Sequence, residues 1–152
     1  MFKSMKKQKG FTLIEILIVI GIIAILAVVT IIAINPARQF AQARNSQRSS
    51  NVNTILNAIN QYGVDNKGAL PTTITTTATE ICQTGAASCT GLIDLSVLTA
   101  SETYLVSIPI DPSCPTGCNA SGIGYTVMQS ANGRVTVDAP LAELGATISV
   151  IR

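Results

Sequence analysis

Four cysteines are the residues of this chain whose type and spacing most directly suggest chemistry, since thiols form disulfides or bind metals: Cys82, Cys89, Cys114 and Cys118. Pairing the first two and the last two closes short loops, each stabilising by about 2 kcal/mol through chain entropy, and we favour these pairs. The crossed pairings stay open. So does a zinc site, although the spacing between Cys82 and Cys89 is wider than such sites usually have.

Catalytic chemistry finds little support in the composition. The sequence contains no histidine, the commonest general base and the usual partner of a serine or cysteine nucleophile. No paired-carboxylate pattern and no phosphate-binding glycine loop is visible. We therefore expect that the protein is not an enzyme.

Glu15 is the only charged residue in an apolar run from Phe11 to Ile34. As a helix this run is roughly 36 Å long, at about 1.5 Å per residue, and a bilayer's hydrocarbon core is roughly 30 Å thick. A carboxylate deep in a spanning helix costs about 2.5 to 3.5 kcal/mol, so it usually has a partner. We expect a membrane anchor. A buried helix of a soluble protein and a cleaved signal peptide are the alternatives, and the run is long for both.

Basic residues flank the apolar run on both sides. Four lysines precede it, and Arg38, Arg44 and Arg48 follow it, which favours a cytoplasmic N-terminus by a narrow margin. Beyond the first ten residues acidic side chains outnumber basic ones. The net charge of +2 is therefore a property of the leader and indicates no nucleic-acid partner.

The residues from Lys9 to Glu15 read KGFTLIE, directly at the start of the apolar run. This stretch resembles the class III signal of type IV prepilins and type II secretion pseudopilins. The resemblance implies that a prepilin peptidase cuts after Gly10 on the cytoplasmic side and methylates the new amine on Phe11. It also implies that Glu15 neutralises that amine on a neighbouring subunit. A Glu15 close enough to the interface to reach water is the alternative.

Asn35-Pro36 interrupts the apolar run, and a kink is expected there because proline removes a helix hydrogen bond. Gly21, Asn35 and Pro36 are expected to be places where the helix loosens when a subunit leaves the membrane. Helical spacing of apolar residues then continues to a stop at Asp65 to Gly68. One face of this stem is expected to pack against the head through Val52, Ile55, Leu56, Ile59 and Tyr62.

The stem between Gln42 and Asn51 is almost wholly polar. Arg44 and Arg48 lie one turn apart on the face that continues into Val52. A solvated helical face fits this pattern, and so does contact with lipid headgroups or an acidic neighbour.

The last third of the sequence predicts a small antiparallel sheet. Tyr125–Gln129 and Arg134–Asp138 alternate in polarity around Asn132-Gly133, which is a strong hairpin signal. Ala146–Ile151 is a third candidate strand. The threonine-rich stretch Thr72–Thr79 suits a loop or an edge strand.

The segment Ser107 to Pro112 resembles a stretch that often precedes the sheet in major pseudopilins. Some pseudopilin heads bind calcium through loop oxygens, and Asp111 lies where such a loop would begin. The other acidic residues are scattered, so calcium in the head has no assigned site and no cofactor is expected.

We therefore predict an α+β, pilin-like fold with four parts: a basic leader over 1–10, a membrane-spanning and filament-core helix over 11–34, an amphipathic helical stem over 35–66, and an extracytoplasmic head over 67–152. The predicted function is that of a structural subunit of a type IV filament, a pilin or a pseudopilin, anchored by a single pass in the inner membrane. Its expected partners are copies of itself, prepilin peptidase, an inner-membrane assembly platform and membrane lipid. A monomeric membrane-anchored binding module is the alternative.

Overall fold

The computed structural model describes residues 10–114 and 116–152. The predicted basic leader therefore lies outside the described residues, apart from Gly10. The described residues divide into two compact units, the first ending at Gln39 and the second running from Phe40 to Arg152.

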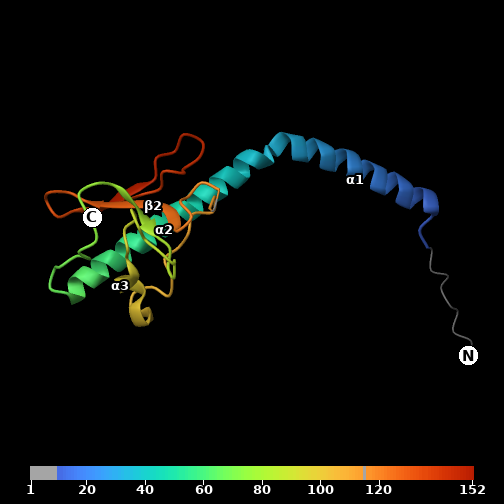
Figure 1. Cartoon of the computed structure of the whole chain (residues 1–152). Coiled ribbons are helices and arrows are strands. Elements are labelled where there is room, and N and C mark those ends of the chain that lie inside the picture. Colours follow the sequence, from blue (N-terminus) through green and yellow to red (C-terminus); the bar gives the residue numbers. More distant parts are fainter. Residues whose placement is uncertain (1–9, 115) are drawn as a thin grey trace, which may run out of the picture. The chain divides into compact units, whose positions relative to one another are not determined.

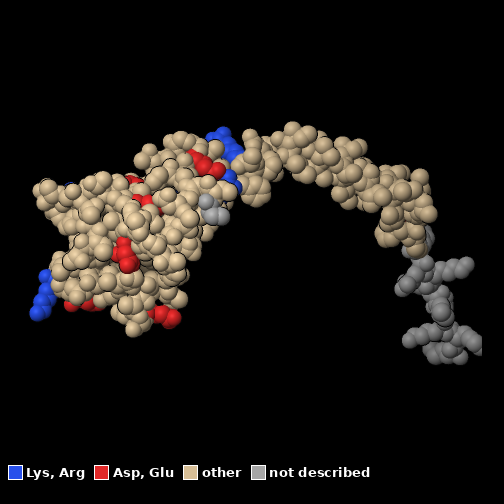
Figure 2. Space-filling view, in the orientation of Figure 1, with Lys and Arg blue, Asp and Glu red and all other residues tan. Residues whose placement is uncertain are grey.

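The first unit contains the apolar helix α1, Leu13–Ile34, labelled in Figure 1. None of its residues is buried, and the face of α1 visible in Figure 2 carries no charged side chain. With a mean hydropathy of 3.4, it is the one helix among the described residues that is long and apolar enough to cross a membrane, by length and composition alone. It begins two residues after the predicted start because Thr12 is its N-cap.

A single residue, Asn35, separates α1 from the second helix, α2, Pro36–Asp65. Asn35 has a left-handed conformation with φ 49°, which ends α1. Its side-chain Oδ1 accepts a hydrogen bond from the Arg38 backbone N–H at 3.3 Å, which caps the start of α2. Pro36 takes the first helical position, where its missing N–H costs nothing. The interruption expected at Asn35-Pro36 is therefore present as a break between two helices.

The helix stop at the end of α2 is confirmed. Lys67 and Gly68 both have positive φ, and the Gly68 N–H donates to the Gly63 carbonyl at 2.7 Å. This bond satisfies one of the last carbonyls of the helix, as a Schellman motif does.

The second unit contains a four-stranded antiparallel sheet in the order β1-β2-β3-β4. The predicted hairpin is confirmed as β2 and β3, with Val127 opposite Val137. The third predicted strand is confirmed as the shorter β4. The fourth strand, β1, was not predicted. The threonine-rich stretch, for which a loop or an edge strand was expected, is a loop except for its last residue, Thr79, where β1 begins. The strands cover Thr79–Cys82 (β1), Gly122–Gln129 (β2), Val135–Asp138 (β3) and Ser149–Ile151 (β4). A short helix α3, Ser96–Thr99, and a 3-10 turn, η1, Ala100–Glu102, lie between β1 and β2.

The core of this unit lies between α2 and the sheet, which lie side by side in Figure 1. The predicted apolar face of the stem is confirmed: Val52, Ile55 and Ile59 are fully buried together with strand residues such as Val127. Tyr62 lies at the edge of this core, where its ring packs edge to face against that of Tyr104, with the ring centroids 5.8 Å apart. A long apolar N-terminal helix followed by a small antiparallel sheet is the predicted α+β, pilin-like class.

Candidate functional site

The predicted processing and assembly residues lie together at the start of α1. Gly10 and Phe11 precede the helix, and the Phe11 side chain is 80% exposed. Glu15 lies in the first turn, where the N-terminal end of the helix dipole favours a negative charge. Gly21 lies inside α1, and Pro36 is the first residue of α2.

Thr12 and Glu15 form a capping box. The Glu15 backbone N–H donates to Thr12 Oγ1 at 3.3 Å, and the Thr12 backbone N–H donates to Glu15 Oε2 at 3.5 Å. Two backbone N–H groups at the helix start are thereby satisfied. This pairing was not predicted above, although Thr-x-x-Glu before an apolar run is its signature. Glu15 therefore has a role within its own chain as well as the role that the resemblance implies.

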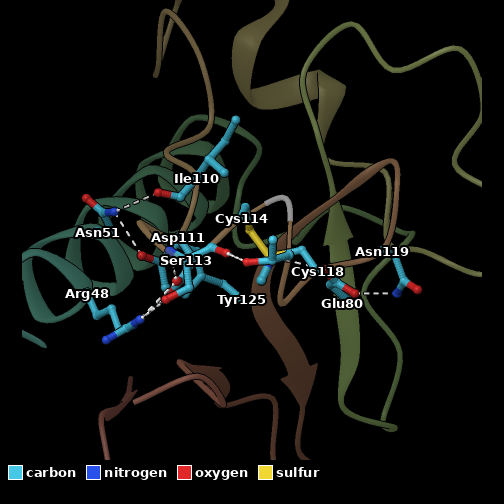
Figure 3. Close-up of a disulfide and its surroundings, with 12 residues drawn as sticks. Arg48, Asn51, Glu80, Ile110, Asp111, Ser113, Cys114, Cys118, Asn119 and Tyr125 are labelled. Carbon is cyan, nitrogen blue, oxygen red and sulfur yellow. Dashed lines mark hydrogen bonds and ion pairs between the residues drawn. A yellow bond between two sulfur atoms is a disulfide. The ribbon is translucent and has the colours of Figure 1, made fainter. Parts of the chain in front are cut away.

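A second group of polar residues surrounds Arg48, which α2 carries into the interior at 0% exposure. Figure 3 shows its guanidinium directed at Asp111 and Ser113. Nε donates to Asp111 Oδ2 at 2.7 Å and Nη2 to Asp111 Oδ1 at 3.1 Å, which makes a two-pronged ion pair. Nη2 also donates to Ser113 Oγ at 2.7 Å. The hydrogen bonds to Asp111 raise the pKa of Arg48, whereas its burial lowers that pKa.

Glu143 binds the other side of the same guanidinium. Arg48 Nη1 donates to Glu143 Oε2 at 2.9 Å, and Arg44 holds the same carboxylate through bonds of 2.7 and 2.6 Å. The hydrogen bonds from Arg44 and then Arg48 lower the pKa of Glu143 to about 2. Asn45 fixes the Glu143 backbone by accepting from its N–H at 2.9 Å and donating to its carbonyl at 2.8 Å. The loop between β3 and β4 is thereby attached to α2.

These contacts decide between the interpretations of the polar stretch of the stem. The solvated-face interpretation is wrong for Arg48, which is buried against two carboxylates of its own chain. Arg44, whose side chain is 38% exposed, also has an acidic partner in Glu143. Asp111, proposed above as the start of a calcium loop, is 2% exposed and is neutralised by Arg48.

The structure pairs Cys82 with Cys89 and Cys114 with Cys118, the two pairs that the sequence analysis favoured. Their Cα atoms are 5.5 and 5.4 Å apart, within the normal range for disulfides. Paired sulfurs are not thiolates, so this arrangement excludes the four-thiolate zinc site. Among the described residues no group of three or more histidine, cysteine, aspartate or glutamate side chains could hold a metal ion.

Comparison with protein families finds a match at the N-terminal end. Residues 5–34 match the family model of the prokaryotic N-terminal methylation motif. The chain carries a prokaryotic N-terminal methylation motif. Comparison with curated proteins and with solved structures finds no match to the chain.

The methylation motif covers KGFTLIE and all of α1, so it confirms the resemblance on which the predicted processing depends. It places a type IV prepilin-like class III signal at residues 5–34. The motif ends at Ile34 and does not extend to the Arg48 group or to the disulfides. The roles of Gly10, Phe11, Glu15 and Gly21 within the motif stay predictions.

Proposed function

We propose that this protein is a structural subunit of a type IV filament, cut after Gly10, methylated on Phe11 and polymerised through α1. The observation that carries this proposal is the methylation motif on a helix with no buried residue. A helix that is apolar on all sides needs a cover, and its own chain provides none for the described residues of α1. Lipid covers it before assembly, and copies of the same helix cover it in the filament.

Glu15 is the residue that specifies how neighbouring copies align. In an apolar bundle an unpaired carboxylate is costly, and the methylated amine of Phe11 in a neighbouring copy is the matching cation. The capping box supports this role because it holds the carboxylate at the helix start, four residues after Phe11 of its own chain and near the end where the Phe11 amine of a neighbouring copy would lie.

The proposed topology has the leader 1–10 in the cytoplasm, the helix 11–34 in the inner membrane, the stem 35–66 beyond it, and the head 67–152 on the extracytoplasmic side. The two disulfides support an extracytoplasmic head, because disulfides persist in oxidising compartments. The partners in this proposal are prepilin peptidase, an inner-membrane assembly platform, lipid and further copies of the chain.

The stretch Ser107 to Pro112 favours a pseudopilin of a type II secretion system over a surface pilin, through its resemblance to the segment before the sheet in major pseudopilins. Filaments sheared from the outside of intact cells and identified as this protein would reverse that assignment.

Processing is tested by mass spectrometry of the protein from membranes of its native host. The expected mature chain begins at a methylated Phe11. A chain that still begins at Met1 in cells with active prepilin peptidase would contradict the proposal.

Assembly is tested by comparing Glu15→Ala with Thr12→Ala, because both changes remove the capping box and only the first removes the carboxylate. We expect Glu15→Ala to abolish filaments while the processed protein remains in the membrane, and Thr12→Ala to assemble. Glu102→Ala, in the exposed η1 turn, is the control for loss of a carboxylate elsewhere. Equal loss of filaments in Glu15→Ala and Thr12→Ala would mean that Glu15 acts only as a helix cap. Normal function of Glu15→Ala would favour the monomeric anchored module.

A further inference from the structure

The Cys114–Cys118 disulfide lies beside the ion pair of Arg48 and Asp111, as Figure 3 shows. Both the disulfide and Asp111 lie against Gly124 of β2. A Cβ atom at Gly124 would lie 2.7 Å from Cys118 Sγ and 2.8 Å from Asp111 Cβ. Gly124 also has φ +80°, a conformation that glycine adopts without strain. The disulfide and the base of the Asp111 side chain therefore pack on one glycine.

The turn that supplies partners to Arg48 directly precedes the loop that the disulfide closes, and Cys114 belongs to both. The Cys114 N–H donates to the Asp111 carbonyl at 3.0 Å, and the Ser113 N–H donates to Asp111 Oδ1 at 2.7 Å. The Gly117 N–H donates to the Ser113 carbonyl at 3.3 Å. Asp111 and Ser113, which both accept hydrogen bonds from Arg48, are thus held by backbone bonds on either side of Cys114.

Arg48 depends on this turn because it is buried. A guanidinium at 0% exposure is tolerated only while carboxylates and other acceptors surround it, and removal of one partner is strongly destabilising. Asn45 and Glu143 serve one nitrogen, Nη1, whereas Nε and Nη2 bond to the turn.

We propose that the Cys114–Cys118 disulfide is a redox-sensitive latch that controls whether Arg48 is buried in the head. To close it, the two thiols lose two protons and two electrons to an oxidising disulfide, which is reduced to two thiols. In the closed form Asp111 and Ser113 receive Arg48. In the open form the turn moves away from Gly124, and the Arg48 side chain becomes exposed to water. Packing of the Arg48 region of α2 against the head then requires an oxidising compartment.

The other disulfide provides a matched control. Cys82–Cys89 connects the end of β1 to the loop that follows it and also closes a short loop, with a sequence separation of 7 against 4 for Cys114–Cys118. None of the groups that bond to Arg48 lies in that loop or next to either of its cysteines, whereas Ser113 directly precedes Cys114. Removing it tests the general loss of a crosslink without opening the turn at Asp111.

The test measures access to Arg48 in the full-length protein in detergent. Phenylglyoxal modifies accessible guanidinium groups, and mass spectrometry gives the rate at Arg48 relative to the exposed Arg134. We expect Arg48 to be protected in the wild type and in Cys82→Ser/Cys89→Ser. We expect it to lose that protection in Cys114→Ser/Cys118→Ser. In the wild type, opening the disulfide with a reductant and closing it again with oxidised glutathione should abolish and restore protection.

Hydrogen exchange of the β2 and β3 amides in the same samples separates a latch from general unfolding. The proposal requires that Arg48 is modified in Cys114→Ser/Cys118→Ser while these strands stay protected. Three outcomes would overturn it: Arg48 protected in both double variants, Arg48 modified equally in both, or Arg48 modified only together with loss of strand protection. None of these outcomes depends on whether the protein forms filaments.

Discussion

The two long helices of this chain obtain their stability in opposite ways. Helix α1 has apolar side chains on all sides and no buried residue among them. Helix α2 is polar over much of its surface, yet eight of its residues are buried: Ala41, Arg48, Val52, Ile55, Leu56, Ala58, Ile59 and Gly63. The chain therefore covers α2 with its own sheet and loops, whereas the described residues leave α1 uncovered.

This difference indicates where changes should affect the folded head and where they should affect assembly. Side chains of α2 are held by partners within the chain, so their loss should appear as lost stability of the second unit. Side chains of α1 are not buried in the chain and, in the proposed function, meet lipid or other copies, so their loss should leave that unit intact. All three tyrosines, Tyr62, Tyr104 and Tyr125, lie in the second unit, so tyrosine fluorescence during urea unfolding reports on that unit alone.

Asp111→Ala should have the largest effect on the stability of the second unit. It leaves Arg48 buried without its main partner, and breaking such a pair costs about 3 to 5 kcal/mol. Urea unfolding of the full chain in detergent measures this loss. Glu102→Ala, which removes an exposed carboxylate, is the matched control and should change the free energy of unfolding little.

The double change Arg48→Met/Asp111→Leu refines this prediction, because it removes both charges together. It should recover most of the stability that Asp111→Ala loses, since replacing a buried ion pair by apolar residues is often close to neutral. A double variant no more stable than Asp111→Ala would mean that packing at this position, rather than the unpaired charge, explains the loss.

Ile59→Ala and Ile23→Ala make the same chemical change in the two helices. Ile59 is fully buried, and its truncation should cost about 2 to 5 kcal/mol of the free energy of unfolding of the second unit. Ile23 is 58% exposed on α1, and its truncation should leave that free energy unchanged. The same urea titration measures both. A destabilised second unit in Ile23→Ala would contradict the view that the chain leaves α1 uncovered.

Local signals in the sequence were sufficient for much of the fold. Asn132-Gly133 predicted the hairpin, Asn35-Pro36 predicted the helix break, and the spacing of Val52 and Ile55 predicted the buried face of the stem. Each of these signals depends on residues a few positions apart. The strand β1 lacked such a signal, because it is short and pairs with β2 some forty residues later.

The site was only partly predictable for the same reason. The methylation motif is a continuous stretch and could be identified from its letters. Arg48 finds Asp111 and Glu143 at separations of 63 and 95 residues, which no local pattern encodes. A clue was present in its spacing, since Arg48 lies four residues before Val52 on the face that becomes buried.

Low pH should weaken the attachment of the β3–β4 loop to α2. Arg44 and Arg48 lower the pKa of Glu143 from 4.5 to about 2, so its ionised form is favoured by folding. The stabilisation it provides is fully present above about pH 4.5 and is lost as the pH falls toward 2. Urea midpoints measured from pH 6 to pH 2 should therefore decrease more in the wild type than in Glu143→Gln. Parallel curves for the two proteins would show that Glu143 does not contribute to acid sensitivity.

Thr12→Ala should have the smallest effect, and it tests whether α1 has any stabilising contact of its own. The change removes the acceptor for the Glu15 N–H and should cost about 1 kcal/mol, within the usual range of about 0.5 to 2 for a lost N-cap. Because no residue of α1 is buried, the loss should appear only as faster hydrogen exchange of the first-turn amides in detergent. Thr30→Ala, which removes a hydroxyl bonded to the Ala27 carbonyl near the other end of α1, is the control. Unchanged exchange in Thr12→Ala would mean that the surrounding detergent or lipid, and not the capping box, fixes the start of the helix.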